Sequence, residues 1–259
     1  MRGQKKYKII ILLMAVIVAA QAVIIFLLAS VPKAPRVLMA PVGRIAIVLD
    51  DWGYNPNNLG IIEGIKYPLT ISVLPNLAYS KSIAQQLGRR GFEIILHLPL
   101  EPREKFRLER DTIMAYMDPK AVTGILKKDL AGLPYTKGVS GHMGSRATED
   151  AKLMAVIFRE LKKRNLYFLD SFVSGKSVCS LVAQEVSLSF ARRDVFLDNQ
   201  EEPLYIRGQL RKLKLLALAK GFAIGVGHDR RITLGVLREV MPELEKEGFK
   251  FVFVSELAH

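Results

Sequence analysis

The chain has 259 residues, half of them hydrophobic, and its 38 Lys and Arg against 25 Asp and Glu give a net charge of +13. That length suits one large domain or two small ones, and the composition is typical of a globular protein with a membrane segment. The single cysteine, Cys179, excludes an intrachain disulfide and is predicted to be a small buried residue. The basic charge favours an anionic partner or reflects solvated helix faces. Since no aromatic-interleaved basic patch accompanies it, we expect no nucleic-acid partner.

A basic tail, residues 1–8, precedes an apolar run whose only clearly polar residue is Gln21. As a helix, residues 9–29 span about 31 Å, close to the thickness of a bilayer core, so we predict a transmembrane signal anchor over 9–30. The basic side should stay in the cytoplasm, which predicts a single-pass protein of the cytoplasmic membrane with its C-terminal domain on the other side. The competing interpretation is a signal peptide cleaved at "AQA" (20–22), which releases a secreted or periplasmic domain.

Three prolines within residues 31–43 predict a linker, after which residues 44–259 form the folded domain. Short apolar runs in this domain alternate with longer helical stretches. The predicted strands are 45–50, 69–74, 92–97, 138–143, 166–170, 194–198, 222–227 and 249–254, and the predicted helices include 78–90, 119–131, 148–164 and 205–220. This alternation predicts an α/β fold in which a distorted parallel β/α barrel of about seven to eight strands has its helices outside. A doubly wound open sheet is the alternative.

Polar side chains recur where these strands end. The stretch "RIAIVLDDWG" (44–53) is an apolar strand, buried on both faces, that ends in Asp50 and Asp51. Three later strands end in the histidines His97, His142 and His228. In a parallel barrel these ends share one rim, where such folds build active sites. Two imidazoles and one carboxylate form a ligand set for a divalent metal such as Zn²⁺, whereas each histidine alone equally suits a structural role.

Five further polar residues near the strand ends are candidates for contacting the substrate or for holding a ligand residue in place: Glu101, Ser145, Arg146, Asp170 and Asp198. Ser145 and Arg146 equally suit a turn that enters the next helix, with Thr148 as its N-cap. Asp170 and Asp198 either orient a ligand histidine or cap a loop.

Seven segments of the domain share a pattern with a known family. They are "IAIVLDDWGY", "PLTISVLP", "EIILHLPLEP", "GHMGSRATED", "LYFLDS", "RRDVFLDN" and "AIGVGH". Together they resemble the divergent polysaccharide deacetylase family, a distant branch of the metal-dependent polysaccharide deacetylases, from residue 44 to about residue 256. The resemblance implies a distorted β/α barrel, a divalent metal (Zn²⁺ is the first choice) and a carbohydrate substrate.

The resemblance also implies a role for each residue at the rim. Asp51 resembles the ligand aspartate of the deacetylase "DD" motif, and Asp50 resembles the catalytic base. His97 and His142 are the implied histidine ligands of the metal. His228 resembles the general acid near the last strands.

Two features of the wider deacetylase family are missing from this chain. No H-x-x-x-H segment is present, so the pairing of His97 with His142 is a prediction about space. The arginine-and-tyrosine motif is also missing, and Arg146 is its candidate stand-in. Two functions follow: a membrane-anchored, exported hydrolase that deacetylates an N-acetylated envelope glycan, or a non-catalytic envelope protein that binds glycan or protein. Trp52, beside the aspartates, suits either stacking on a sugar ring or ordinary packing.

Overall fold

The computed structural model describes residues 13–14, 16–26 and 41–259 of the chain. The two N-terminal stretches are helical, and in the part of the chain that is described no helix is long and apolar enough to cross a membrane. The rest of the predicted anchor, the basic tail and most of the linker lie outside the described residues. The predicted membrane topology therefore stays a prediction. From Pro41 onward the chain forms a unit of its own.

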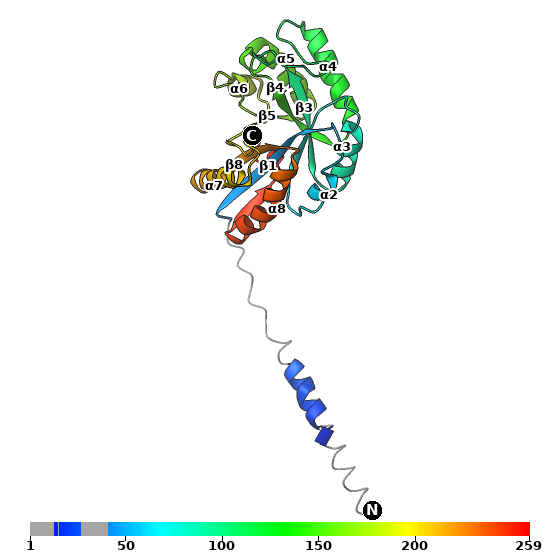
Figure 1. Cartoon of the computed structure of the whole chain (residues 1–259), viewed down its shortest axis with the longest axis vertical. Coiled ribbons are helices and arrows are strands. Elements are labelled where there is room, and N and C mark those ends of the chain that lie inside the picture. The colour runs from blue at the N-terminus through cyan, green and yellow to red at the C-terminus, as the bar shows by residue number, and fades with distance from the viewer. Residues whose placement is uncertain (1–12, 15, 27–40) are drawn as a thin grey trace, which may run out of the picture. The chain divides into compact units, whose positions relative to one another are not determined.

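Nine parallel strands form one sheet in this unit (Figure 1). They are β1 (Gly43–Trp52), β2 (Thr70–Val73), β3 (Glu93–Leu100), β4 (Thr136–Met143), β5 (Tyr167–Asp170), β6 (Phe190–Arg192), β7 (Val195–Phe196), β8 (Phe222–His228) and β9 (Phe249–Val252). The strand order is β6-β5-β4-β3-β2-β1-β8-β7, and β9 pairs with the first half of β1. This is the order of a barrel opened between β6 and β7, so the expected curled parallel β/α sheet is confirmed and the doubly wound alternative does not apply.

The two edge strands, β6 and β7, are successive parts of one chain segment. The segment pairs with β5 at its start and with β8 at its end. Between these parts, Arg193 N donates to Asp170 O at 3.0 Å and Asp194 N donates to Ile224 O at 2.9 Å. The predicted strand over 194–198 corresponds to β7. The segment changes its neighbour halfway, so β6 precedes β7 as an additional short strand.

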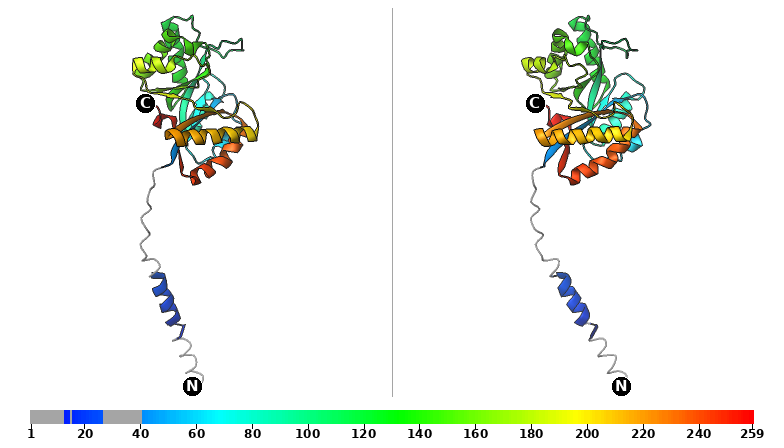
Figure 2. Two further views of the ribbon diagram at one scale, coloured as in Figure 1. Left: turned by 90° about the vertical axis from the view of Figure 1, so that its left-hand side faces the viewer. Right: turned by 60° about the vertical axis from the view of Figure 1, so that its left-hand side comes forward.

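Helices cover the outside of the curled sheet, as Figures 1 and 2 show. They are α2 (Leu59–Ile62), α3 (Ser80–Arg89), α4 (Pro119–Gly132), α5 (Ala151–Lys163), α6 (Cys179–Val186), α7 (Pro203–Lys220) and α8 (Arg231–Lys246), with the 3-10 turns η1 (Ala147–Glu149) and η2 (Val254–Glu256). The predicted helices correspond to α3, α4, α5 and α7, whereas α6 and α8 are additional. Asp150, not Thr148, is the N-cap of α5, because Thr148 lies in η1 and Asp150 accepts a hydrogen bond from Leu153 N at 3.0 Å. Cys179 is free and buried, as predicted.

The alternation of side chains along each strand decides which residues face the inside of the barrel. Along β1, Ala46 and Val48 pack inside, whereas Ile45, Ile47 and Leu49 pack on the other face against the helices. All five are fully buried, so the prediction of a strand that is apolar on both faces is confirmed. Residues two apart on a strand share a face. The inside positions toward the carboxyl ends of β1, β2, β3, β4 and β8 are therefore Asp50, Ser72, His97, Ser140, His142 and His228.

Candidate active site

The chain bends at the second of the two aspartates in β1. Asp50 keeps its inside position and is buried. Asp51 has φ 66°, in the left-handed region, and the pairing of β1 with β2 is irregular between Leu49 and Trp52. Aspartate is one of the few residue types that adopt this region readily. Because neighbours on a regular strand point to opposite faces, this bend is what brings the second carboxylate to the same rim as the first.

Asp51, His97 and His142 converge at this rim. Asp51 Oδ1 lies 3.2 Å from His97 Nε2 and 3.1 Å from His142 Nδ1. The same two ring nitrogens are 3.1 Å apart, and the rings meet edge to face with their centroids 4.9 Å apart. The structure thus brings together the three side chains that were predicted as metal ligands, from the ends of three different strands.

The donor atoms of this cluster fit a divalent cation. One ligand atom from each of the three side chains lies within 4.8 Å of the others. Asp51 Oδ1 is buried and has no hydrogen-bond partner among the described residues, and the same is true of His142 Nε2. One carboxylate oxygen and two imidazole nitrogens are a donor set that Zn²⁺ accepts in catalytic sites, where a fourth position stays open. A cation between these atoms satisfies the unpartnered oxygen, so the residues present suit the expected metal.

The charges at the rim influence one another strongly. Burial alone raises the pKa of Asp51, but the close imidazoles of His142 and His97 hold that pKa well below its usual range. Burial also raises the pKa of Asp50, and it stays raised although the charges of His97 and His228 lower it. Burial lowers the pKa of His97, but the carboxylates of Asp50 and Asp51 outweigh burial and raise it. The two neighbouring aspartates therefore differ: Asp51 stays ionised, and Asp50 takes up a proton more readily.

His228 lies beside Asp50, its partner in the pairing of β8 with β1. His228 Nδ1 is 2.7 Å from Asp198 Oδ1, and Asp198 Oδ2 accepts hydrogen bonds from His228 N at 2.8 Å and Thr233 Oγ1 at 2.7 Å. Burial alone lowers the pKa of His228, but the fully buried Asp198 carboxylate raises it. Of the two roles predicted for Asp198, its contacts with His228 fit the orientation of a histidine. His228 Nε2 is then the atom available for proton transfer.

A half-buried arginine that sequence reasoning missed lies next to this pair. The Arg193 guanidinium is 3.6 Å from the ring centroid of Phe196, and the Phe196 ring stacks on His228 with centroids 6.0 Å apart. Arg193 also donates hydrogen bonds to two carbonyl oxygens after β5, at 2.5 and 3.0 Å. Burial lowers the pKa of Arg193, against the charges of three aspartates that include Asp50. Two adjacent arginines in "ARRD" give no sequence signal for which of them faces inward.

Glu101, Ser145 and Arg146 take part in a separate network. The exposed Arg146 has its Nε 3.1 Å from Glu101 Oε1, and Glu101 Oε2 accepts a hydrogen bond from Ala115 N at 2.6 Å. Ser145 Oγ accepts a hydrogen bond from Arg103 N at 2.9 Å. These contacts hold the loop between β3 and α4. The contacts that the structure shows for these residues do not involve the cluster, and their roles toward a substrate stay predictions.

Asp170 occupies an outward position on β5, since Phe168, two residues earlier, packs in the layer between sheet and helices. Its Oδ1 accepts a hydrogen bond from Phe172 N at 2.8 Å, and its Oδ2 accepts one from Ser177 Oγ at 2.7 Å. Of the two roles predicted for Asp170, the structure therefore shows contacts for the loop cap. Trp52 is fully buried, which excludes stacking on a sugar and leaves packing.

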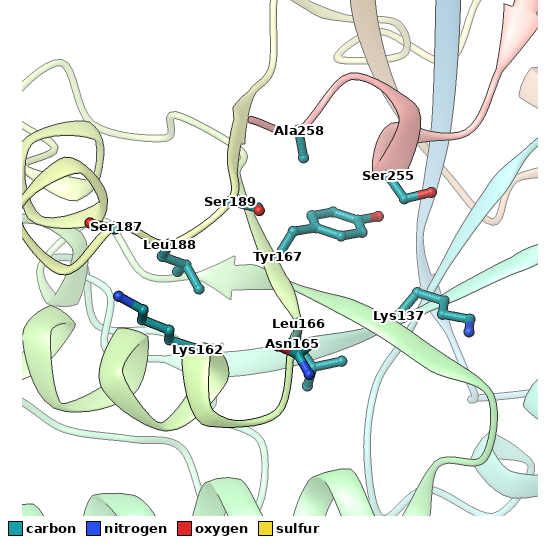
Figure 3. Close-up of a pocket in the computed structure, with 10 residues that line it drawn as sticks. All are labelled: Lys137, Lys162, Asn165, Leu166, Tyr167, Ser187, Leu188, Ser189, Ser255 and Ala258. Atoms are coloured by element: carbon teal, nitrogen blue, oxygen red, sulfur yellow. The ribbon is translucent and has the colours of Figure 1, made fainter.

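The cavity drawn in Figure 3 lies at the other end of the barrel. It has a volume of about 390 Å³, and its lining includes Lys137, Asn165 and Tyr167, at or just before the amino ends of β4 and β5. His142 and Asp170 lie at the opposite ends of these strands. Because parallel barrels build active sites at the carboxyl ends of their strands, we assign the chemistry to the rim that holds the cluster.

The fold and the rim together define a class of protein. It is a curled parallel β/α barrel with an aspartate–histidine–histidine cluster at the carboxyl ends of its strands and an Asp–His pair beside it. Residues 47–258 match the family model described as "Divergent polysaccharide deacetylase". The chain therefore belongs to the divergent polysaccharide deacetylase family, which confirms the resemblance in its sequence motifs.

Individual proteins are also similar to this chain. The uncharacterized protein YibQ of Escherichia coli K12 is 32% identical over 209 residues, which cover 80% of this chain and 66% of YibQ, just under two thirds of that relative. The crystal structure of the uncharacterized protein ATU2773 from Agrobacterium tumefaciens C58 has a TM-score of 0.79 at 26% identity and covers 86% of this chain and 92% of that chain. The catalytic domain of a peptidoglycan N-acetylglucosamine deacetylase from Eubacterium rectale has a TM-score of 0.52 at 11% identity, with coverage of 86% and 92%, and shows the fold alone.

Proposed function

We propose that the protein is a metal-dependent hydrolase that removes acetyl groups from an N-acetylated glycan of the cell envelope. The observation that carries this proposal is the convergence of Asp51, His97 and His142, with 3.1–3.2 Å between their ligand atoms, next to Asp50 and His228. Amide hydrolysis requires activation of the carbonyl and of water, a proton acceptor and a proton donor. The rim contains a candidate for each of these tasks.

Asp51 Oδ1, His97 Nε2 and His142 Nδ1 would hold a divalent cation, which would supply a Lewis acid for the amide carbonyl and would lower the pKa of water. Asp50 is the proton acceptor, because burial brings the pKa of its carboxyl nearer to neutrality, where a general base works best. His228 donates a proton from Nε2 to the leaving nitrogen. The raised pKa of His228 favours its protonated form at neutral pH.

The proposed location is the outer side of the cytoplasmic membrane. The basic tail ahead of the apolar run supports an uncleaved anchor over 9–30, with signal cleavage as the alternative route out of the cytosol. Of the net charge of +13, residues 1–8 carry +4, and the remaining +9 suits an anionic envelope polymer as the substrate or its surroundings.

The test is acetate release by the purified full chain, loaded with Zn²⁺, from oligomers of N-acetylglucosamine and from isolated cell-wall glycan. We expect release that stops on chelation and returns on reloading with metal. Asp50→Asn should lose on the order of 10²–10⁴ in rate while it keeps its metal, because it lacks only the proton acceptor. Zn²⁺-loaded protein that releases no acetate from either substrate contradicts the hydrolase proposal.

A non-catalytic protein that binds envelope glycan or protein is the second candidate. It is favoured by the missing H-x-x-x-H segment. This candidate predicts glycan binding that survives chelation and the Asp50→Asn change, without acetate release. Binding to labelled oligosaccharides, measured with and without metal, separates the two candidates.

A further inference from the structure

Two buried serines inside the barrel have no part in the chemistry described above. Ser72 lies on β2 and Ser140 on β4, on either side of the strand that carries His97, and both are fully buried. Ser140 is the partner of His97 in the pairing of β3 with β4, and its Oγ lies 2.8 Å from His97 Nδ1. The two serine hydroxyls are 2.7 Å apart. A continuous hydrogen-bonded chain thus runs from the histidine ring across two strands.

The carboxyl group beside this chain determines its direction. Asp50 Oδ1 lies 3.7 Å from His97 Nδ1, and this buried oxygen has no hydrogen-bond partner among the described residues. An N–H on Nδ1 points a donor toward this acceptor, whereas a lone pair there does not. With the N–H on Nδ1, His97 donates to Ser140, and the Ser140 hydroxyl then donates to Ser72, because a hydroxyl can donate one hydrogen bond and accept another.

This direction leaves the lone pair of His97 on Nε2. Nε2 is the ring nitrogen that faces the cluster, at 3.2 Å from Asp51 Oδ1 and 3.1 Å from His142 Nδ1. The opposite tautomer places an N–H at the ligand position. It also turns the lone pair of Nδ1 toward Asp50, whose Oδ1 is 3.7 Å away, which is unfavourable.

We propose that Ser140 and Ser72 are positioning residues that fix His97 with its Nε2 lone pair toward the metal cluster. The proposal rests on the proposed function in one respect, namely that His97 is a metal ligand. Hydrogen-bond partners behind a ligand histidine typically change metal affinity by about 10–100-fold when they are removed. Here a pair of hydroxyls takes the place that a carboxylate or backbone carbonyl usually fills.

The test uses the full chain with Ser140→Ala, Ser72→Ala and the control Ser80→Ala, which removes a buried hydroxyl that is hydrogen-bonded to backbone groups after β2. Zn²⁺ affinity is measured by competition with a chelator. We expect about 10–100-fold weaker binding for Ser140→Ala, a smaller loss for Ser72→Ala, and no more than about a twofold change for the control.

A second readout does not depend on metal. Long-range nitrogen–proton NMR spectra of the metal-free protein, recorded at a pH above the raised pKa of His97 so that the ring is neutral, report which nitrogen carries the proton. The wild type should show N–H on Nδ1, and both site variants should lose this preference. If Ser140→Ala does not fold, the test uses Ser72→Ala, because Ser72 does not contact the His97 ring directly. Wild-type N–H on Nε2, or unchanged Zn²⁺ affinity in the folded site variants, overturns the inference. A wild type that binds no Zn²⁺ overturns the metal assignment and with it the role as ligand positioner, even where NMR shows the expected tautomer.

Discussion

Replacing Asp51 by Asn should remove most of the metal affinity. The change is nearly isosteric, and asparagine tolerates the left-handed conformation at φ 66°, so the bend that ends β1 should survive. The other two ligands are neutral imidazoles when they bind metal, so this carboxylate supplies the only negative charge among the ligand atoms. At about 2.1 Å from a divalent ion, and with the dielectric constant of water, one unit of charge contributes about 4 kcal/mol, or about 10³-fold in affinity.

The matched control is Asp50→Asn, which makes the same chemical change one residue away. Asp50 contributes no ligand atom to the cluster, so its variant should lose no more than about tenfold in affinity. Competition with a chelator gives the dissociation constants for Zn²⁺, and thermal unfolding of each variant shows that it is folded. A folded Asp51→Asn protein that binds Zn²⁺ within about threefold of wild type refutes the ligand assignment. Equal losses in both variants refute the division of roles between the two aspartates.

Three further outcomes are expected. Asp198→Asn should lower the pKa of His228, because the carboxylate that raises it is lost, and NMR titration of the ring measures this. Because the pKa of His228 is raised in the folded state, the Asp198–His228 pair stabilises the protein fully below about pH 6.5, and this stability is lost as pH rises through the folded pKa. The protonated His228 that turnover needs is lost over the same pH range. The high-pH limb of activity should therefore move to lower pH in this variant. Gly138→Ala should destabilise the fold by about 1–3 kcal/mol in denaturant unfolding, because the added Cβ lies 2.5 Å from the ring of Tyr167. Gly124→Ala, at an exposed helical position with open space, should be neutral or stabilising. An alkaline phosphatase fusion placed after the linker should be active. If this fusion is inactive and a cytosolic reporter fused at the same position is active, the predicted orientation is reversed.

The candidate ligands could be predicted because alternation and strand ends are visible in the sequence. The run from Ile45 to Leu49 marks β1, and the first polar side chain after it must lie at the rim. The same argument applies to His97 and His142, although 44 residues separate them and no motif joins them. Parallel pairing puts their strands side by side, so their convergence follows from topology. The left-handed bend at Asp51 has no comparable signal, since most aspartates at strand ends do not adopt it.

Arginines near the rim are harder to predict from the sequence. Arg146 follows His142 closely in the sequence, and closeness along the chain made it the candidate stand-in. Its side chain pairs with Glu101, whereas Arg193 lies against Phe196, whose ring stacks on His228. Strands of three and two residues are too short to show an alternation, so no pattern indicates which arginine faces inward.

The serines show that the alternation rule reaches further than the strand ends. Ser72 interrupts the apolar run of β2, and Ser140 precedes His142 by two residues on β4, so both face the same side as the rim histidines. A hydroxyl in a buried strand needs a hydrogen-bond partner, and inside a parallel barrel the partners lie on the neighbouring strands. The inside positions one level below the rim are therefore where a supporting hydrogen-bonded chain has to lie. A serine in an apolar strand that lies beside a strand ending in histidine therefore predicts the group that holds the histidine. The sequence of this chain contains two such serines, Ser72 and Ser140.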